Sequence, residues 1–365
     1  MKLTAILFAG VIIISAATSC KKEGGNNNNN NGGDHHTNPP TPVTDVYAAG
    51  FENTSNPIAS YWKNSAVTHL SSDTKGAATG IAVSGSDVYV VGYSVMPAGN
   101  TVAAYWKNGV RTYLTETTKN SEASAIVVSG SDVYIAGYTG DITGPTSKQA
   151  VAVYWKNGVQ ITLGDAASAT ISSFARAIAV QGSDVYVAGN VTGPTGFAAT
   201  YWKNGTAVTL SGSKPEYSSQ LFGISIYGND IYATGQVYGT LTAGDIPRFA
   251  ATYWKNGVPV TFATTTATEA IGTVVQNNDV YIIGTLNPTS NTTLAGYWKN
   301  GAFTGIGPSG SNPPSSLATS FCLSGSDIYV GGNIGGFTPC YWKNGALVQI
   351  PGSSGSIFAI TVVTK

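Results

Sequence analysis

The sequence is poor in charge, in cysteine and in histidine. Of 365 residues, 18 are Lys or Arg and 18 are Asp or Glu, so only 10% are charged and the net charge is zero, against about 25% in an ordinary soluble domain. With three Arg in all, the chain lacks the basic face that nucleic acid requires. Three Cys are too few for a disulfide framework, and three His, two of them adjacent, are too few for a His-rich metal site. The composition therefore predicts no nucleic-acid partner, no metal and no other cofactor.

Long hydrophobic runs are also missing, apart from one at the N-terminus. Lys2 precedes an apolar run over residues 3–17, which is too short to span a bilayer comfortably and is typical of a secretory signal peptide, here residues 1–19. Small residues then lead into Cys20. This ending resembles the signal of bacterial lipoproteins, in which the Cys becomes the acylated N-terminus; ordinary cleavage beside a Cys is the alternative. The resemblance implies lipidation at Cys20 and a membrane anchor, and with Lys21 an outer-membrane lipoprotein of the cell envelope, on the periplasmic side or the cell surface.

Residues 20–43 carry the acylated Cys and a polar segment rich in Gly and Asn. This segment has almost no apolar side chain to bury, so it predicts a disordered tether. As a flexible coil it would reach about 25 Å from the membrane. The remaining residues, 44–365, form the folded domain.

All seven Trp of the sequence belong to one motif, Tyr-Trp-Lys-Asn, whose copies are 44 to 52 residues apart. The motif begins at Tyr61, Tyr105, Tyr154, Tyr201, Tyr253, Tyr297 and Tyr341. A second motif, Asp-(Val/Ile)-Tyr followed after two residues by Gly, begins at Asp45, Asp87, Asp132, Asp184, Asp230, Asp279 and Asp327. Self-similarity at this period is typical of a propeller or a solenoid.

Each repeat unit predicts four short strands, which we call a to d from the inner edge outward. In the second unit they are residues 80–83, 87–92, 103–107 and 110–114. Ser84-Gly85-Ser86 and Asn108-Gly109 predict the turns, and Asn-Gly is the strongest signal for a tight hairpin. Seven such units predict an all-β fold, a seven-bladed β-propeller. The first unit starts at strand b (44–47) and residues 358–362 align with strand a, so we expect the C-terminal strand to close the ring beside the N-terminal one.

The layout Tyr-Trp-Lys-Asn-Gly, a Thr/Leu strand, a Ser/Ala-rich segment and a turn into Val-Tyr-Val-Ala-Gly resembles the HAF-type extracellular repeat. It is similar, more distantly, to kelch repeats, most closely over residues 327–332. The resemblance covers residues 44–365 and implies a β-propeller. Neither family implies one activity, because kelch proteins include both enzymes and binding modules.

The repeated residues predict structural roles. We expect Tyr89 opposite Tyr105, which sets Asp87 opposite Lys107 and gives each unit a cross-strand ion pair; a ring of seven Lys that binds an anion is the alternative. Each Trp is expected to pack between blades, and the alternative is a platform for sugars. Cys322 and Cys340 lie on strands a and c, about 9–10 Å apart, which is too far for a disulfide.

Binding is expected on the face formed by the b–c and d–a connections, because these vary in length while the turns do not. The start of strand a should rim the channel at seven equivalent positions, Thr79, Ser124, Arg176, Phe222, Ile271, Thr319 and Phe358. Arg176 is the only charge among them, and we interpret it first as an exposed rim Arg. If a ligand binds here, Arg176 is the first candidate for a contact, since a guanidinium recognises carboxylates. Phe222, Phe358 and Tyr217 are candidate aromatic contacts, and Arg248 lies in the long b–c segment of its unit. The residue after each rim position is always small, which predicts crowding of the inner strands.

No catalytic constellation is recognisable. Nine acids lie outside the repeat motifs and the tail, and nothing in their spacing selects a pair. His69 is expected on an outer strand, where it is a surface residue rather than part of a triad. The leading hypothesis is therefore a non-catalytic, monomeric envelope lipoprotein whose propeller binds a protein or a glycan. The alternatives are a polysaccharide hydrolase or lyase, and a purely structural envelope protein.

Overall fold

The computed structural model describes most of the chain from residue 43 onward. The described residues are 43–53, 56–71, 74–140, 150–164, 171–193, 196–210, 218–239, 248–262, 268–289, 292–308, 314–351 and 354–365. The expected signal peptide, Cys20 and nearly all of the tether lie outside them.

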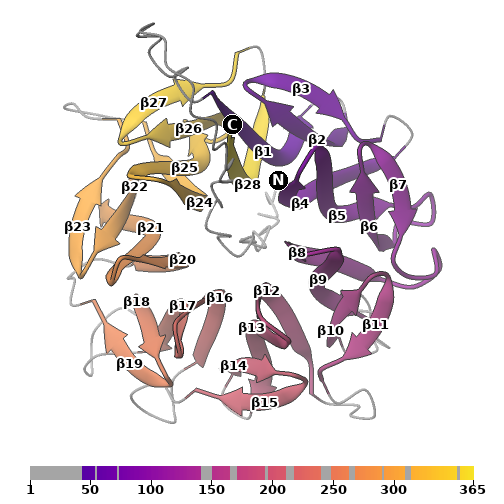
Figure 1. Cartoon of the computed structure of the whole chain (residues 1–365), viewed down its shortest axis with the longest axis horizontal. Helices are drawn as coiled ribbons and strands as arrows, with labels where there is room; N and C mark the ends of the chain where they lie inside the picture. The colour runs from indigo at the N-terminus through magenta and orange to yellow at the C-terminus, as the bar shows by residue number, and fades with distance from the viewer. Residues whose placement is uncertain are drawn as a thin grey trace, which may run out of the picture.

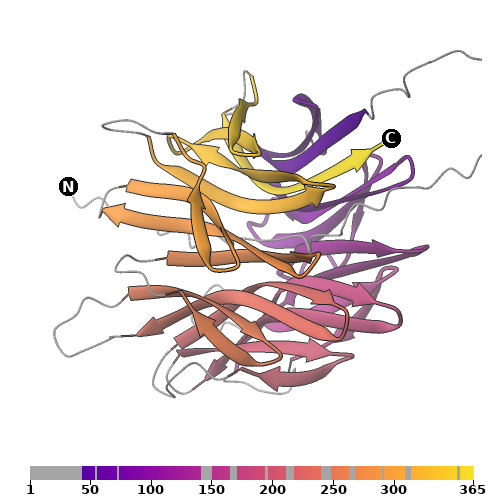
Figure 2. The ribbon, with the colours of Figure 1, turned by 60° about the vertical axis from the view of Figure 1, so that its left-hand side comes forward.

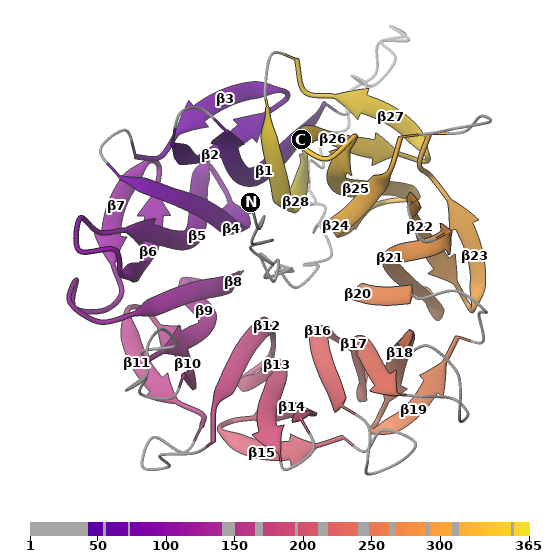
Figure 3. The same cartoon turned by 180° about the vertical axis from the view of Figure 1, so that it is seen from behind.

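The described strands form seven four-stranded antiparallel sheets around a common axis (Figure 1), and Figure 3 shows the same ring from behind. The prediction of a seven-bladed β-propeller is confirmed. No helix occurs in the described part of the chain, and so none there is long and apolar enough to cross a membrane.

Blades are numbered from the one that contains β1. From blade 1 to blade 7, the innermost strands are β28 (Gly355–Thr364), β4 (Lys75–Ser84), β8 (Ser121–Ser129), β12 (Ser173–Gln181), β16 (Ser218–Tyr227), β20 (Thr268–Gln276) and β24 (Ser316–Ser324). The second strands are β1 (Thr44–Asn53), β5 (Asp87–Val95), β9 (Asp132–Thr139), β13 (Asp184–Gly193), β17 (Asp230–Gly239), β21 (Asp279–Thr289) and β25 (Asp327–Ile334). The third strands are β2 (Pro57–Lys63), β6 (Thr101–Lys107), β10 (Val151–Lys156), β14 (Gly196–Lys203), β18 (Arg248–Lys255), β22 (Thr292–Lys299) and β26 (Thr338–Lys343). The outer strands are β3 (Ala66–His69), β7 (Val110–Tyr113), β11 (Val159–Thr162), β15 (Thr206–Thr209), β19 (Val258–Thr261), β23 (Ala302–Gly305) and β27 (Ala346–Gln349).

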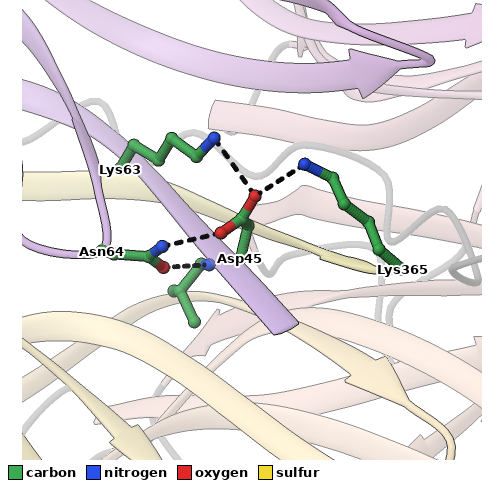
Figure 4. A network of polar contacts seen from close by, with 5 residues as sticks. Asp45, Lys63, Asn64 and Lys365 are labelled. Atoms are coloured by element: carbon green, nitrogen blue, oxygen red, sulfur yellow. Dashed lines mark hydrogen bonds and ion pairs between the residues drawn. The ribbon is translucent and has the colours of Figure 1, made fainter. Parts of the chain in front are cut away.

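The ring closes between its two chain ends, as predicted. β28 pairs antiparallel with β1, with Val362 opposite Val46, and Figure 2 shows the yellow strand beside the indigo one. Around this junction Asp45 contacts two lysines: its Oδ2 lies 3.1 Å from Nζ of both Lys63 and Lys365 (Figure 4). Asn64 donates from Nδ2 to Asp45 Oδ1 at 2.7 Å. These contacts, that of Asn64 foremost, lower the pKa of Asp45 to about 2.

The Asn of each repeat motif forms the tight turn between the third and the outer strand. In blade 2, Asn108 and Gly109 both have positive φ, 52° and 82°, as a two-residue hairpin requires. Asn108 Oδ1 accepts from the backbone N–H of Val88 at 2.9 Å, and its Nδ2 donates to Asp87 at 2.8 Å. The same two bonds occur in all seven blades. The motif Asn therefore ties this turn to the start of the second strand.

The expected register of these strands is wrong by two residues. Tyr89 pairs with Lys107, not with Tyr105, and Tyr105 lies opposite Val91. The shift places Asn108 where it can accept from Val88, so the turn chemistry outweighs the pairing of the two tyrosines. The expected ion pair nevertheless forms diagonally, with Lys107 Nζ 2.8 Å from Asp87 Oδ2 and 5.1 Å from the centroid of the Tyr89 ring.

An Asp–Lys ion pair is present in every blade, so the motif lysines form no ring of free cations.

The motif tryptophans pack between blades, as predicted. Each is at most 2% exposed, so none of them is a platform for a ligand. Trp106 of blade 2 packs with Tyr47, Ala49 and Leu70 of blade 1, and Trp155 of blade 3 packs in the same way against blade 2. Burial of so large an aromatic surface at each contact stabilises the ring.

Cys322 on β24 and Cys340 on β26 are both buried and not joined by a disulfide, which confirms that prediction. They pack in different clusters of the core. Burial raises the pKa of the Cys340 thiol to about 12.

Every innermost strand carries one β-bulge, at the seven positions that the sequence indicates as the channel rim. The bulged residues are Thr79, Ser124, Arg176, Phe222, Ile271, Thr319 and Phe358. Strand a was expected to begin beside them, but the strands begin earlier: β4 starts at Lys75. Pairing with the second strand continues across the bulge, and so the bulges lie within the strands.

The bulge explains the Gly in the second repeat motif. In blade 2, a Cβ at Gly92 would collide with the carbonyl oxygen of Ala77, and the same clash faces the corresponding Gly of each blade. The residue after the bulge is small because the inner strands crowd there, as predicted. A Cβ at Gly223 would come within 3.0 Å of the Cα of Gly272 in the next blade.

Candidate functional site

The two faces of the ring differ in kind. The c–d turns of all seven blades and the a–b turns of blades 2 to 7 lie on one face and have two residues each, as the pairs Lys107–Val110 and Ser84–Asp87 show. The b–c and d–a connections lie on the other face and differ between blades: five residues separate β5 from β6, and three separate β1 from β2. A rigid ring with variable connections is the usual arrangement of a binding scaffold.

One layer of the inner strands, next to the bulges and toward the variable face, differs in every blade. We call it the variable layer. It consists of seven cross-strand pairs, Ser356/Phe51, Ala77/Tyr93, Glu122/Tyr138, Phe174/Asn190, Gln220/Gln236, Glu269/Thr285 and Leu317/Asn333. The Trp, Lys, Asn, Asp and Gly of the repeat are by contrast the same in all seven. The fold therefore does not dictate the residues of this layer.

Arg176 is the one charged residue among the seven bulged positions and lies beside the variable layer, partly buried. Its Nε donates to Asn190 Oδ1 at 3.2 Å, which fixes the guanidinium. The guanidinium carbon lies 6.0 Å from the centroid of the Phe174 ring and 5.7 Å from that of Phe222, within the range of a cation–π contact. No carboxylate of the described residues comes within 4.0 Å of it. Burial lowers the pKa of Arg176, but a guanidinium still stays protonated.

Glu122 is buried in the blade before Arg176. It is 6% exposed, and Tyr138, opposite it in the same blade, donates to its Oε2 at 2.9 Å. Burial raises the pKa of Glu122 to about 7, a rise opposed by the hydrogen bond from Tyr138 and by the charge of Arg176. Burial, with the nearby Glu122, also raises the pKa of Tyr93 to about 12 and that of Tyr138 further. Both phenols therefore stay neutral at physiological pH.

Three buried polar atoms of the variable layer find no hydrogen-bond partner among the described residues. They are Asn190 Nδ2, Gln236 Oε1 and Thr285 Oγ1, which belong to the consecutive blades 4, 5 and 6. A buried polar group without a partner costs free energy and asks for an explanation.

The other candidate residues have different surroundings. Phe222 is buried and faces Arg176. Phe358 is partly buried and contacts Phe51 in its own blade, with ring centroids 5.7 Å apart. Tyr217 lies outside the described residues. Arg248 opens β18 opposite Gly239, and its side chain is not among those described.

Glu122, Tyr138, Asn190 and Tyr93 went unrecognised as a group in the sequence. A signal for Glu122 and Glu269 was present, because both stand two residues before a rim position. No local sequence signal identifies Tyr138 or Asn190 as site residues. They lie on strand b, and only strand pairing and the packing of neighbouring blades bring them to Glu122 and Arg176.

The remaining described acids and His69 are engaged in local contacts or stand apart. His69, on the outer strand β3 as expected, has Nε2 2.6 Å from Glu52 Oε2, and Glu116 pairs with Lys119 at 3.1 Å. Glu269 lies three blades from Glu122. Asp73, Asp141, Asp165, Glu216 and Asp245 lie outside the described residues. Within the described part, no three His, Cys, Asp or Glu side chains gather as a metal site would need.

No protein-family model matches the chain, and no curated protein matches it. Among solved structures, it is similar to puromycin hydrolase (9% identity, 78% of this chain and 55% of that chain, TM-score 0.39) and to the β-propeller domain of the Trilobed protease from Pyrococcus furiosus (11%, 75% and 84%, 0.44). A mutant of Aleuria aurantia lectin in complex with alpha-methyl-L-fucoside is similar at 13% identity (78% and 93%, 0.39). The chain spans about half the length of the puromycin hydrolase. Similarity at this level gives no information about activity. The seven four-stranded blades define the fold class of this chain as a seven-bladed β-propeller.

Proposed function

We propose that this protein is a non-catalytic lipoprotein of the cell envelope, similar to HAF-type repeat proteins, whose propeller binds a protein or glycan partner through the variable layer and the connections above it. The observation that carries the binding role is the contrast within the repeat. Residues that build the blades are identical in all seven, while the variable layer differs in each and contains buried polar atoms without partners.

The lipid anchor rests on the apolar N-terminal run and Cys20. It is tested by fractionating cells that express the full chain or Cys20→Ser. The proposal expects the wild type in the outer-membrane fraction and the variant released from it. Equal fractionation of the two would contradict acylation at Cys20.

The binding role is tested with the full chain in detergent, on a glycan array and by affinity capture from envelope extract. Arg176→Ala is the test variant. Arg111→Gln is the matched control, because Arg111 lies on the outer strand β7, away from the variable layer. The proposal expects a bound partner that Arg176→Ala loses and Arg111→Gln keeps. If the wild type captures neither glycan nor protein, a structural role is favoured instead.

One observation favours a second candidate, a polysaccharide hydrolase or lyase. A buried carboxyl with a pKa near 7, such as that of Glu122, is suited to general acid catalysis. Hydrolysis by two carboxylates requires a second one within about 5–10 Å, and Glu269 stands three blades away. Release of reducing ends from polysaccharides by the wild type, but not by Glu122→Gln, would establish the enzyme over the binding protein.

A further inference from the structure

The variable layer has a chemistry that narrows the class of partner. The positive charge beside it is that of Arg176, whose Nε is held by Asn190. Within the described residues nothing accepts from the two terminal nitrogens of this guanidinium, and no carboxylate pairs with it. A fixed, partly desolvated guanidinium with two unused donors matches a carboxylate, which it can hold by two parallel hydrogen bonds.

The neighbours of Arg176 are neutral hydrogen-bonding groups and aromatic rings rather than further charges of the same sign. Asn190, which holds the guanidinium, is a neutral amide. Phe174 and Phe222, on either side of the guanidinium, add apolar surface of the kind that ligand sites place beside a few polar groups.

From these observations we propose that Arg176 binds the carboxylate of a hexuronic acid unit in an acidic polysaccharide. This inference rests on the proposed binding function and names its ligand class. A single fixed cation flanked by neutral partners suits one acidic sugar better than an acidic peptide, whose several carboxylates would need several cations.

Glu122 sets how this site responds to pH. The groups that face it are Tyr138 in its own blade, Tyr93 in blade 2 and Arg176 in blade 4. The two phenols and the guanidinium keep their charge states between pH 5 and 8, and so does a sugar carboxylate, which leaves Glu122 as the group that titrates. When Glu122 is protonated, its negative charge no longer repels the carboxylate of the ligand, and binding tightens as the pH falls from 8 to 6.

The test is titration calorimetry on the full chain in detergent, with trigalacturonate, trimannuronate and triguluronate as probes. The methyl ester of each probe is the matched control, because it removes the charge and keeps the sugar. We expect at least one acid to bind, and its ester to bind about tenfold more weakly or worse. Arg176→Gln should weaken binding by at least about tenfold, Arg176→Lys should weaken it less, and Arg111→Gln should leave it unchanged. Glu122→Gln should bind equally at pH 6 and pH 8.

Four results would overturn the inference: no binding of any of the three acids, equal binding of acid and ester, full affinity in both Arg176 variants, or tight binding of a triglutamate peptide in place of the sugars. If the array or the capture experiment still yields a partner that needs the variable layer, the proposed function stands and only its ligand class is wrong. If both fail, the binding role fails as well. If Arg176→Gln lowers the melting temperature, Arg176→Lys and the comparison of acid with ester still test whether Arg176 binds the carboxylate.

Discussion

The ammonium group of Lys365, the last residue, lies 3.1 Å from the carboxylate of Asp45, near the start of the folded ring. Asp45 is the counterpart of the motif Asp in the other six blades, but it has two Lys partners instead of one, and its side chain is 9% exposed where that of Asp327 is 34% exposed. The blade that joins the chain ends therefore carries an additional ionic contact across β1 and β28.

Loss of the Asp45 contacts should weaken the closure of the ring. We expect Asp45→Asn to lower the free energy of unfolding by about 1–3 kcal/mol, because a partly buried carboxylate loses charged hydrogen bonds. Asp327→Asn, the same change in blade 7, should cost about 0.2–1 kcal/mol. Urea unfolding of both variants checks this, and equal losses would show that the junction is no more sensitive than any other blade.

The same contacts predict acid sensitivity. The pKa of Asp45 is lowered to about 2, below about 3.9 in an unfolded chain. Its contribution to stability is therefore complete above about pH 4 and is lost as the pH falls through about 2. Urea unfolding from pH 5 to pH 2 should show this loss, and Asp45→Asn should show less of it. A variant with the undiminished acid dependence of the wild type would contradict the assignment.

The raised pKa of Glu122 predicts the opposite dependence of stability on pH. Burial raises its pKa to about 7, above about 4.3 in an unfolded chain, so the native state holds a proton that the unfolded chain releases. Stability should fall as the pH rises from about 4.5 to about 7, by an amount on the order of 2–3 kcal/mol. Glu122→Gln should abolish this fall and be the more stable protein at pH 8. Thermal melts at pH 5 and pH 8 test this; parallel pH profiles of the two proteins would refute it.

The Gly opposite each bulge should tolerate no side chain. At Gly235 a Cβ would collide with the carbonyl oxygen of Gln220, so Gly235→Ala should cost about 3 kcal/mol or more, or prevent folding. Gly228 is the control, since its φ is +59° and nothing lies within 4 Å of a Cβ built there. Blade 6 has Asn277 at this place with φ 52°, and Gly228→Asn should be nearly neutral. Comparable losses for the two variants, measured by urea unfolding, would count against the bulge as the reason for the Gly.

Replacement of two adjacent residues of one motif, Trp202 and Lys203, should have very different effects on stability. Trp202 is 1% exposed between blades 3 and 4, and Trp202→Ala should cost about 3–5 kcal/mol. The ammonium group of Lys203 lies on the surface beside Asp184, and Lys203→Gln should leave the unfolding midpoint almost unchanged. Calorimetric melts of both variants decide this. A large loss of stability in Lys203→Gln would show that the exposed ion pairs contribute more to stability than their solvent-exposed geometry predicts.

The seven blades, their tight turns, the burial of the tryptophans and the closure of the ring were all predictable from the sequence. Each depends on chemistry within one repeat, such as the positive φ of Asn108 and Gly109, and the repetition multiplies the signal. The strand register was not predictable in the same way. The hydrogen bond from Val88 to Asn108 selects it, and a shift of two residues keeps every side chain on the same face, so alternation alone cannot detect the error.

The candidate site was predictable in part. The sequence by itself determined that Arg176 is the one charge among the rim positions and that the variable connections share a face. Only the tertiary structure decided that Glu122, Tyr138 and Asn190 surround it, because these residues belong to different strands and blades and meet through strand pairing and the curvature of the ring. A repeat sequence specifies each blade by local interactions, whereas contacts between unlike positions of neighbouring blades exist only once the ring has closed.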